Sequence, residues 1–269
     1  MLLQALILSA AFAGAGSFEP ADFEAWTSSL TEEDLHTKTF STYAGRPADI
    51  FALCGPGGKL ELPKPYLSDY RFSKQDLAAL QKTLDAARRY AKIEDAAKDG
   101  YLPSALGFIP SVGLEMVHPD LVRDGDYDFA HPDVLAYLRK TETEEYRLVG
   151  MIFISGPSRP LRRRVDFGEY SRLITRGGAP ASTWGRDDDV CIVVEPARSA
   201  TIYYGADAPH GCKDGARFDR MYRLYVWTPV YNPLGLFAGK NTVVDWLDHA
   251  QDFPPLCPKR PKPRSESEQ

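Results

Sequence analysis

Residues 73–100 read SKQDLAALQKTLDAARRYAKIEDAAKDG, and the fold expected for the chain follows from this stretch. Ser73 stands where a helix N-cap is preferred, and Asp76 follows at the third helical position, as in a capping box. Gly100 is a typical helix stop. Apolar residues recur on one helical face, namely Leu77, Leu80, Leu84, Ala87 and Ala91. The pattern predicts one long helix over residues 74–98.

After Gly100 the pattern changes from helical to extended. Runs rich in β-branched and aromatic residues, separated by Gly, Pro and Asp, predict strands at residues 112–117, 134–138, 146–154, 190–195, 201–204 and 222–228. Most links between them are too short for a helical crossover, so the strands should pair antiparallel. The expected fold class is α+β: a mostly antiparallel sheet packed against one long helix, with an N-terminal helical arm within residues 18–60.

The N-terminus has the pattern of a secretory leader. An apolar run is followed by Ala13-Gly14-Ala15, which predicts a signal peptide over residues 1–15. The run lacks Lys and Arg, so a buried N-terminal helix is the alternative. No later stretch reaches the ~20 apolar residues of a membrane span. We therefore expect a secreted or otherwise extracytoplasmic protein, with a single domain at residues 16–253 and a loose Pro-rich tail at 254–269.

Net charge and cysteine content bear on the possible partners and on the disulfides of the protein. The net charge is -5, which gives no basic face for nucleic acid. The chain has four cysteines, an even number that favours two disulfides in an exported protein, although four buried thiols are the alternative. Three connectivities are possible. The more local pair is Cys191 with Cys212, which leaves Cys54 to pair with Cys257.

Motif searches point to no cofactor and no metal. The sequence has no G-x-S-x-G, H-E-x-x-H, P-loop or G-x-G-x-x-G motif, and its five histidines are well separated. The alternating carboxylates of residues 124–128 lack the rest of a calcium loop and suit a turn. The charge runs Arg162–Arg164 and Asp187–Asp189 suit solvated faces that pair with each other.

Two stretches carry the candidate chemistry. In residues 112–118, alternation separates Glu115 from Val112, Leu114 and Met116, and places this carboxylate at a wet surface or in a pocket that raises its pKa. In residues 222–237, one strand face carries Arg223, Tyr225 and Trp227 before an Asn-Pro-x-Gly turn. Such a strip grips an anionic or aromatic ligand, although Tyr and Trp are also ordinary strand residues.

The same stretches resemble an uncharacterised family of exported proteins. The resemblance lies in five motifs. Residues 89–101 are similar to R-Y-x-D-x-x-A-A-x-x-D-G-Y, residues 113–119 to G-x-H-Y-x-N-P, and residues 124–137 to D-G-x-x-D-x-x-x-P-E-x-L-x-Y. Residues 148–153 are similar to L-V-G-V-E-Y, and residues 225–237 to H-V-W-x-W-x-H-N-P-x-G-x-F. Family positions with His, Glu, His and His hold Glu115, Ile152, Tyr225 and Tyr231 here. The resemblance therefore implies retained pocket walls with changed chemistry, and one carboxylate with two phenols is a poor ligand set for zinc or copper.

Two functional hypotheses follow, and a third remains. The first is a secreted protein that binds a small organic molecule through Arg223, Trp227, Asn232 and His118, with the phenols of Tyr225 and Tyr231 beside them. The second is a metal-free lyase, isomerase or hydrolase, with Glu115 as general acid/base and Tyr225 or Tyr231 as proton donor. The third is an exported structural or partner-binding protein without a pocket.

Overall fold

The computed structural model places the central part of the chain. It describes residues 52–54, 59–63, 72–140, 145–156, 185–195, 198–204, 212, 215–232 and 234–248. The predicted signal peptide, most of the predicted N-terminal arm, the Arg162–Arg164 run and the predicted tail lie outside these residues.

The described elements are mostly strands. In chain order they are β1 (Leu53–Cys54), β2 (Leu60–Glu61), α5 (Lys74–Arg89), α6 (Ile93–Lys98), β3 (Leu102–Ile109), β4 (Gly113–Val117), α7 (Pro119–Asp124), β5 (Val134–Lys140), β6 (Glu145–Ser155), β7 (Gly185–Glu195), β8 (Ser199–Tyr204), β9 (Gly215–Val226) and α8 (Thr242–Asp248).

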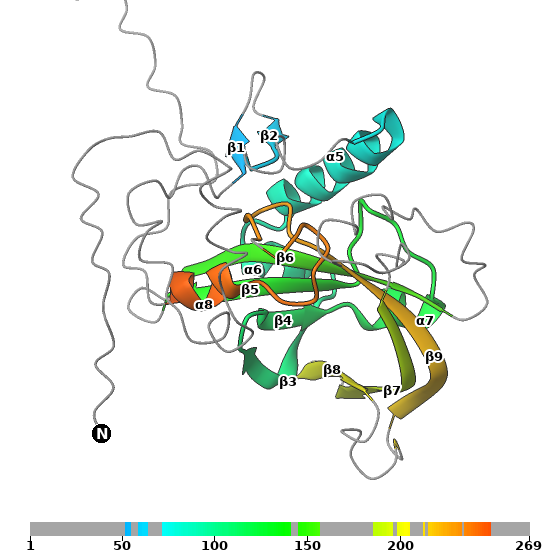
Figure 1. Ribbon diagram of the computed structural model, residues 1–269. Coiled ribbons are helices and arrows are strands. Elements are labelled where there is room, and N and C mark those ends of the chain that lie inside the picture. The colour runs from blue at the N-terminus through cyan, green and yellow to red at the C-terminus, as the bar shows by residue number, and fades with distance from the viewer. Residues whose placement is uncertain are drawn as a thin grey trace, which may run out of the picture.

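Strands β3 to β9 form one seven-stranded antiparallel sheet in the order β3-β4-β5-β6-β9-β7-β8. The sheet curls until its two edge strands meet, as Figure 1 shows. At that seam the Ala105 backbone N–H of β3 donates a hydrogen bond to the Thr201 hydroxyl of β8 at 2.9 Å. The result is a nearly closed, barrel-like sheet, which protects most of the strand edges from further pairing.

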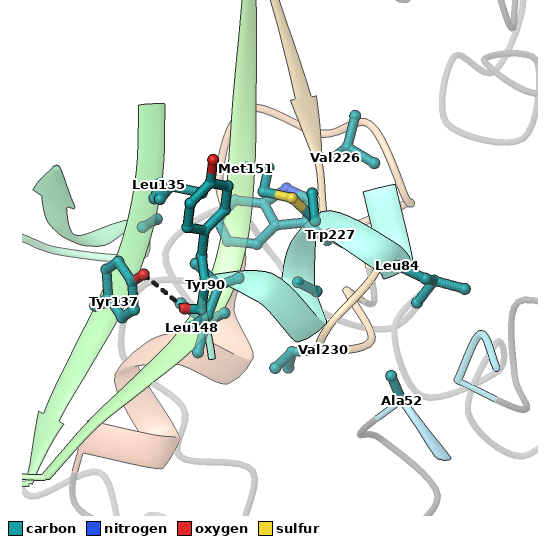
Figure 2. Close-up of a cluster of buried hydrophobic side chains, with 14 of the residues drawn as sticks. Ala52, Leu84, Tyr90, Leu135, Tyr137, Leu148, Met151, Val226, Trp227 and Val230 are labelled. Atoms are coloured by element: carbon teal, nitrogen blue, oxygen red, sulfur yellow. Dashed lines mark hydrogen bonds between the residues drawn. The ribbon is translucent and has the colours of Figure 1, made fainter. Parts of the chain in front are cut away.

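The predicted α+β layer with one long helix is wrong. The expected helix over residues 74–98 is divided, because α5 ends at Arg89 and Lys92 has extended backbone angles before α6 begins. At the break, the Tyr137 hydroxyl of β5 donates a hydrogen bond to the Tyr90 carbonyl at 2.7 Å (Figure 2). The expected capping box at Ser73 and Asp76 is present. Short helices therefore pack on a curled sheet that carries the fold.

Strand β3 was not predicted at all. It contains Pro103 and Gly107, which weaken a strand pattern and are found mostly at edges and irregularities. Its pairing with β4 shifts register between Pro103 and Phe108. The strand forms because it lies at the sheet edge, where a missing backbone donor is tolerated.

Two apolar clusters separate the faces of the sheet. The first, here called the outer core, packs α5 against the outside of the sheet and includes Leu84, Tyr137, Met151, Val226 and Trp227 (Figure 2). The second, here called the barrel interior, includes Val117, Val134, Ile152, Ile154, Val190, Ile192, Ala200, Ile202 and Met221. Strand alternation sends neighbouring residues to opposite faces, so strands such as β5, β6 and β9 contribute to both clusters.

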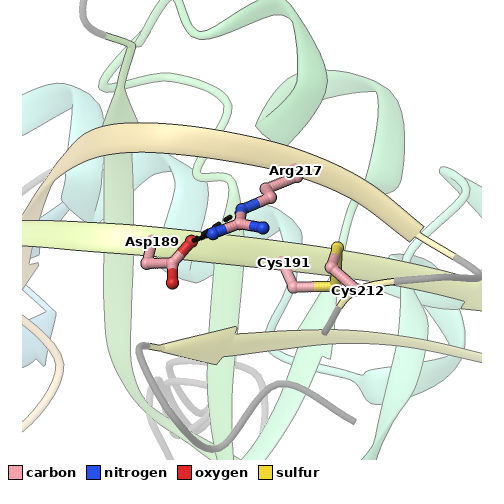
Figure 3. The surroundings of a disulfide bond; sticks show 4 residues. All are labelled: Asp189, Cys191, Cys212 and Arg217. Atoms are coloured by element: carbon pink, nitrogen blue, oxygen red, sulfur yellow. Dashed lines mark hydrogen bonds and ion pairs between the residues drawn. A yellow bond between two sulfur atoms is a disulfide. The ribbon is translucent and has the colours of Figure 1, made fainter. Parts of the chain in front are cut away.

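Cys191 of β7 and Cys212 form a disulfide with a Cα–Cα distance of 5.5 Å. This is the more local of the two expected pairs. Close by, Asp189 of β7 pairs with Arg217 of the neighbouring strand β9 (Figure 3). The expected partner of Cys54, Cys257, lies outside the described residues. Among the helices of the described part, none combines the length and apolar character needed to cross a membrane.

Candidate functional site

Polar side chains gather in the barrel interior at one place. Alternation along β4 directs Glu115 and Val117 to the same face, and β9 pairs with β6 so that Tyr225 lies opposite Ile152 and Arg223 opposite Ile154. Strands β7 and β8 add Asp187 and Tyr204. We call Glu115, Asp187, Tyr204, Arg223 and Tyr225 the interior cluster. Charge interactions link Glu115 to Arg223, Tyr225 and Tyr204.

Arg223 is the centre of this cluster. Its Nη2 lies 2.9 Å from Oδ1 of Asp187, and its Nη1 donates a hydrogen bond to the Tyr225 hydroxyl at 2.9 Å. The guanidinium carbon lies 4.0 Å from the centre of the Tyr204 ring, within the range of a cation–π contact. Asp187 therefore neutralises the charge of Arg223, while two phenols hold its plane in position.

Glu115 is buried, with 8% of its surface exposed. Within the part of the chain that the structure describes, no group makes a hydrogen bond or an ion pair with its carboxyl group. Burial raises the pKa of Glu115 to about 7, and the Arg223 charge only partly opposes this rise. A carboxyl with that pKa exchanges its proton near neutral pH.

The two phenols of the cluster stay protonated at neutral pH. Burial raises the pKa of Tyr225 to about 12, against the opposing effect of Arg223. Burial likewise raises the pKa of Tyr204 far above its ordinary value. Both hydroxyl groups are therefore hydrogen-bond donors and acceptors rather than bases.

Trp227 belongs to the outer core and contacts the cluster at Tyr225. Its ring stacks on Tyr225 with the centres 6.1 Å apart and the planes 10° apart, and its Nε1 donates a hydrogen bond to the Ala238 carbonyl at 2.6 Å. Gly150 of β6 makes room for this ring, because a Cβ atom there would lie 2.6 Å from Trp227. Tyr225 thus contacts both Arg223 and Trp227, so the three side chains of the predicted strip lie together, although Trp227 follows the end of β9 and packs in the outer core.

Three predicted site residues have other contacts. His118 caps α7, accepting a hydrogen bond at Nδ1 from the Leu121 backbone, and packs edge-on against Tyr101. Asn232 uses its carboxamide within its own loop, donating to the Lys240 carbonyl and accepting from the Leu234 backbone. Tyr231 is buried in the outer core. The structure therefore does not bring these three to the interior cluster.

Two members of the cluster were missed from the sequence. Asp187 was expected in a solvated charge run, but it faces Arg223, and Asp189 of the same run pairs with Arg217. Tyr204 ends β8, with the register placing Val190 of β7 opposite it. Their only sequence signal was a position beside or within a strand-like run. The sequence could not predict their contacts, because these depend on the register between β7, β8 and β9.

The acidic turn after α7 has local hydrogen bonds. Asp124 accepts from the Asp126 backbone, and Asp128 accepts from the Ala130 backbone and contacts His131. These contacts are those of an Asp/Gly turn. In the described ranges, no three His, Cys, Asp or Glu side chains are grouped so that they could hold a metal ion.

Comparison with known proteins adds no relative. No protein-family model matches the chain, and neither a curated protein nor a solved structure does. The resemblance to an uncharacterised exported family stays a prediction from its motifs, and the function has to be inferred from the site itself.

Proposed function

We propose that this protein is an exported binding protein that holds a small organic molecule at the interior cluster. The observation that supports the proposal best is the buried Glu115 carboxyl group, which has no hydrogen-bonding partner among the described residues. Glu115 is not among the described residues with fully covered, unpartnered side-chain oxygens, so its carboxyl group remains accessible to a small molecule. Convergent polar groups beside aromatic rings are the usual lining of a small-molecule site.

Access to the cluster also supports binding. The side chain of Arg223 is 22% exposed, and Tyr204 and Tyr225 are both half-buried. Part of each of these three side chains therefore reaches solvent, while Glu115 stays almost covered.

Export is supported by the disulfide between Cys191 and Cys212 together with the leader-like N-terminal sequence. Disulfides persist mainly in oxidising compartments outside the cytosol. Expression with the leader intact, followed by N-terminal sequencing of the recovered protein, tests this placement. Cleavage after Ala15 is expected, and an intact Met1 on protein held in the cytosol would contradict it.

The binding proposal is tested by mass spectrometry of small molecules released from the purified native protein. We expect a released molecule from the wild type and from Tyr203→Ala, but not from Tyr204→Ala. Tyr203 is the matched control, because it is half-buried on the same strand and alternation turns it to the other face.

Equal release from all three proteins would place the molecule outside the barrel interior and contradict the proposal. Release from none of them would favour an exported structural or partner-binding protein instead.

A second function, a metal-free enzyme, is favoured by one observation. The pKa of Glu115 at about 7 suits a general acid/base, since proton transfer is most efficient when that pKa is near the working pH. The phenol of Tyr225 would serve as proton donor. Incubating the released molecule with protein and following it by NMR separates the functions: an enzyme changes the molecule and Glu115→Gln abolishes the change, whereas a binding protein returns it unaltered.

A further inference from the structure

The charges of the interior cluster do not cancel. Asp187 and Arg223 form an ion pair at 2.9 Å and neutralise each other. Among the described residues, no charged side chain forms an ion pair with Glu115. When its carboxyl group is ionised, the cluster as a whole carries one negative charge.

An anionic ligand fits this balance poorly. The strip with Arg223 was expected to bind an anionic or aromatic ligand, but the Asp187 carboxylate already occupies one side of the guanidinium. A second anion would leave the cluster with an excess of negative charge in a low-dielectric interior, where unpaired charges are strongly unfavourable. A cation would remove the excess instead.

We infer that the molecule bound at the interior cluster carries an ammonium group, which pairs with the Glu115 carboxylate while its organic part packs against Tyr204, Tyr225 and Trp227. This inference rests on the proposed binding function. Ionised carboxylates form strong hydrogen bonds to ammonium groups. Aromatic faces attract cations as well, and Arg223 over Tyr204 shows that the rings of this cluster accept one.

The surroundings of Glu115 make such binding dependent on pH. The groups that face it are Arg223 and Tyr225 of β9 and Tyr204 of β8, and its cross-strand neighbour on β5 is Ala136. The phenols stay neutral and Arg223 stays charged over the working range, so Glu115 alone titrates. An ammonium group selects the ionised carboxylate, and its affinity therefore rises as the pH increases through about 7.

The test compares three probes of one shape: benzylamine, benzyl alcohol and benzoate, titrated calorimetrically into the full-length protein. At about pH 8 we expect benzylamine to bind at least about tenfold more tightly than either other probe. Between about pH 8 and about pH 6 its affinity should fall about tenfold, the change in the ionised fraction of a group with a pKa near 7. At pH near 7, titrations in buffers of different ionisation enthalpy should show release of about half a proton.

Glu115→Gln provides the matched variant. It should lose the preference for benzylamine and its pH dependence, while a circular dichroism spectrum like that of the wild type reports an intact fold. Tighter binding of benzoate or benzyl alcohol than of benzylamine would overturn the inference and leave the binding function standing. Binding of none of the three probes would also overturn it, and the molecule released from the native protein then decides the binding function separately.

Discussion

Replacing Arg223 with Met is expected to lower the free energy of unfolding by about 3 kcal/mol, the largest stability effect in the interior cluster. The methionine fills similar space, but it leaves the Asp187 carboxylate without the guanidinium at 2.9 Å. Losing this partner is unfavourable for a charge in a mostly buried position, and the figure is at the low end because Asp187 keeps 15% of its side chain exposed. Urea denaturation followed by circular dichroism measures the change.

A double variant separates the lost charge pair from lost packing. Arg223→Met combined with Asp187→Leu removes both charges, and we expect it to be more stable than Arg223→Met alone. If the loss of unfolding free energy in the double variant instead equals the sum of the losses in the two single variants, the ion pair does not hold the cluster together. Asp187→Leu alone should also be destabilised, since Arg223 then lacks its carboxylate partner.

Replacing Gly113 with Ala is expected to cost about 3 kcal/mol of stability, for two reasons. Gly113 has φ +108°, a conformation that L residues with a side chain rarely adopt. Its added Cβ would also lie 2.6 Å from the backbone carbonyl oxygen of Tyr137 on β5, where nothing flexible can move aside. The strand that carries Glu115 would have to shift away from its neighbour.

Gly107→Ala is the control for that change. Gly107 also has a positive φ, +68°, but a Cβ there meets nothing within 4 Å. We expect a loss of about 1 kcal/mol from backbone conformation alone. Equal losses for the two variants, measured by the same urea denaturation, would show that the close approach of β4 and β5 does not limit stability.

Local sequence patterns anticipated the features that depend on near neighbours. Alternation placed Arg223, Tyr225 and Trp227 together, and the contacts between them are present. The capping box at Ser73 follows from residues three positions apart. Such patterns succeed because the chain itself sets the geometry over a few residues.

Features that depend on distant residues were not anticipated. The break after α5 lies where the Tyr90 carbonyl receives a hydrogen bond from Tyr137, 47 residues away. The role of Asp187 depends on the register of β7 against β9, and closure of the barrel depends on contact between β3 and β8. Local propensity carries no information about any of these contacts, so the α+β layer was the simpler but wrong expectation.

The proposed site depends on one claim, that Glu115 is buried inside the barrel and forms no hydrogen bond or ion pair with any described residue. Titration of carbon-13 labelled glutamate carboxyl groups by NMR tests it directly, with Glu115→Gln identifying the signal. We predict one glutamate signal with a midpoint at about pH 7 that is missing from the variant. If the signal lost in the variant titrates near pH ~4.3, the ordinary value for a solvated glutamate, the carboxyl group is not buried and the proposed site is wrong.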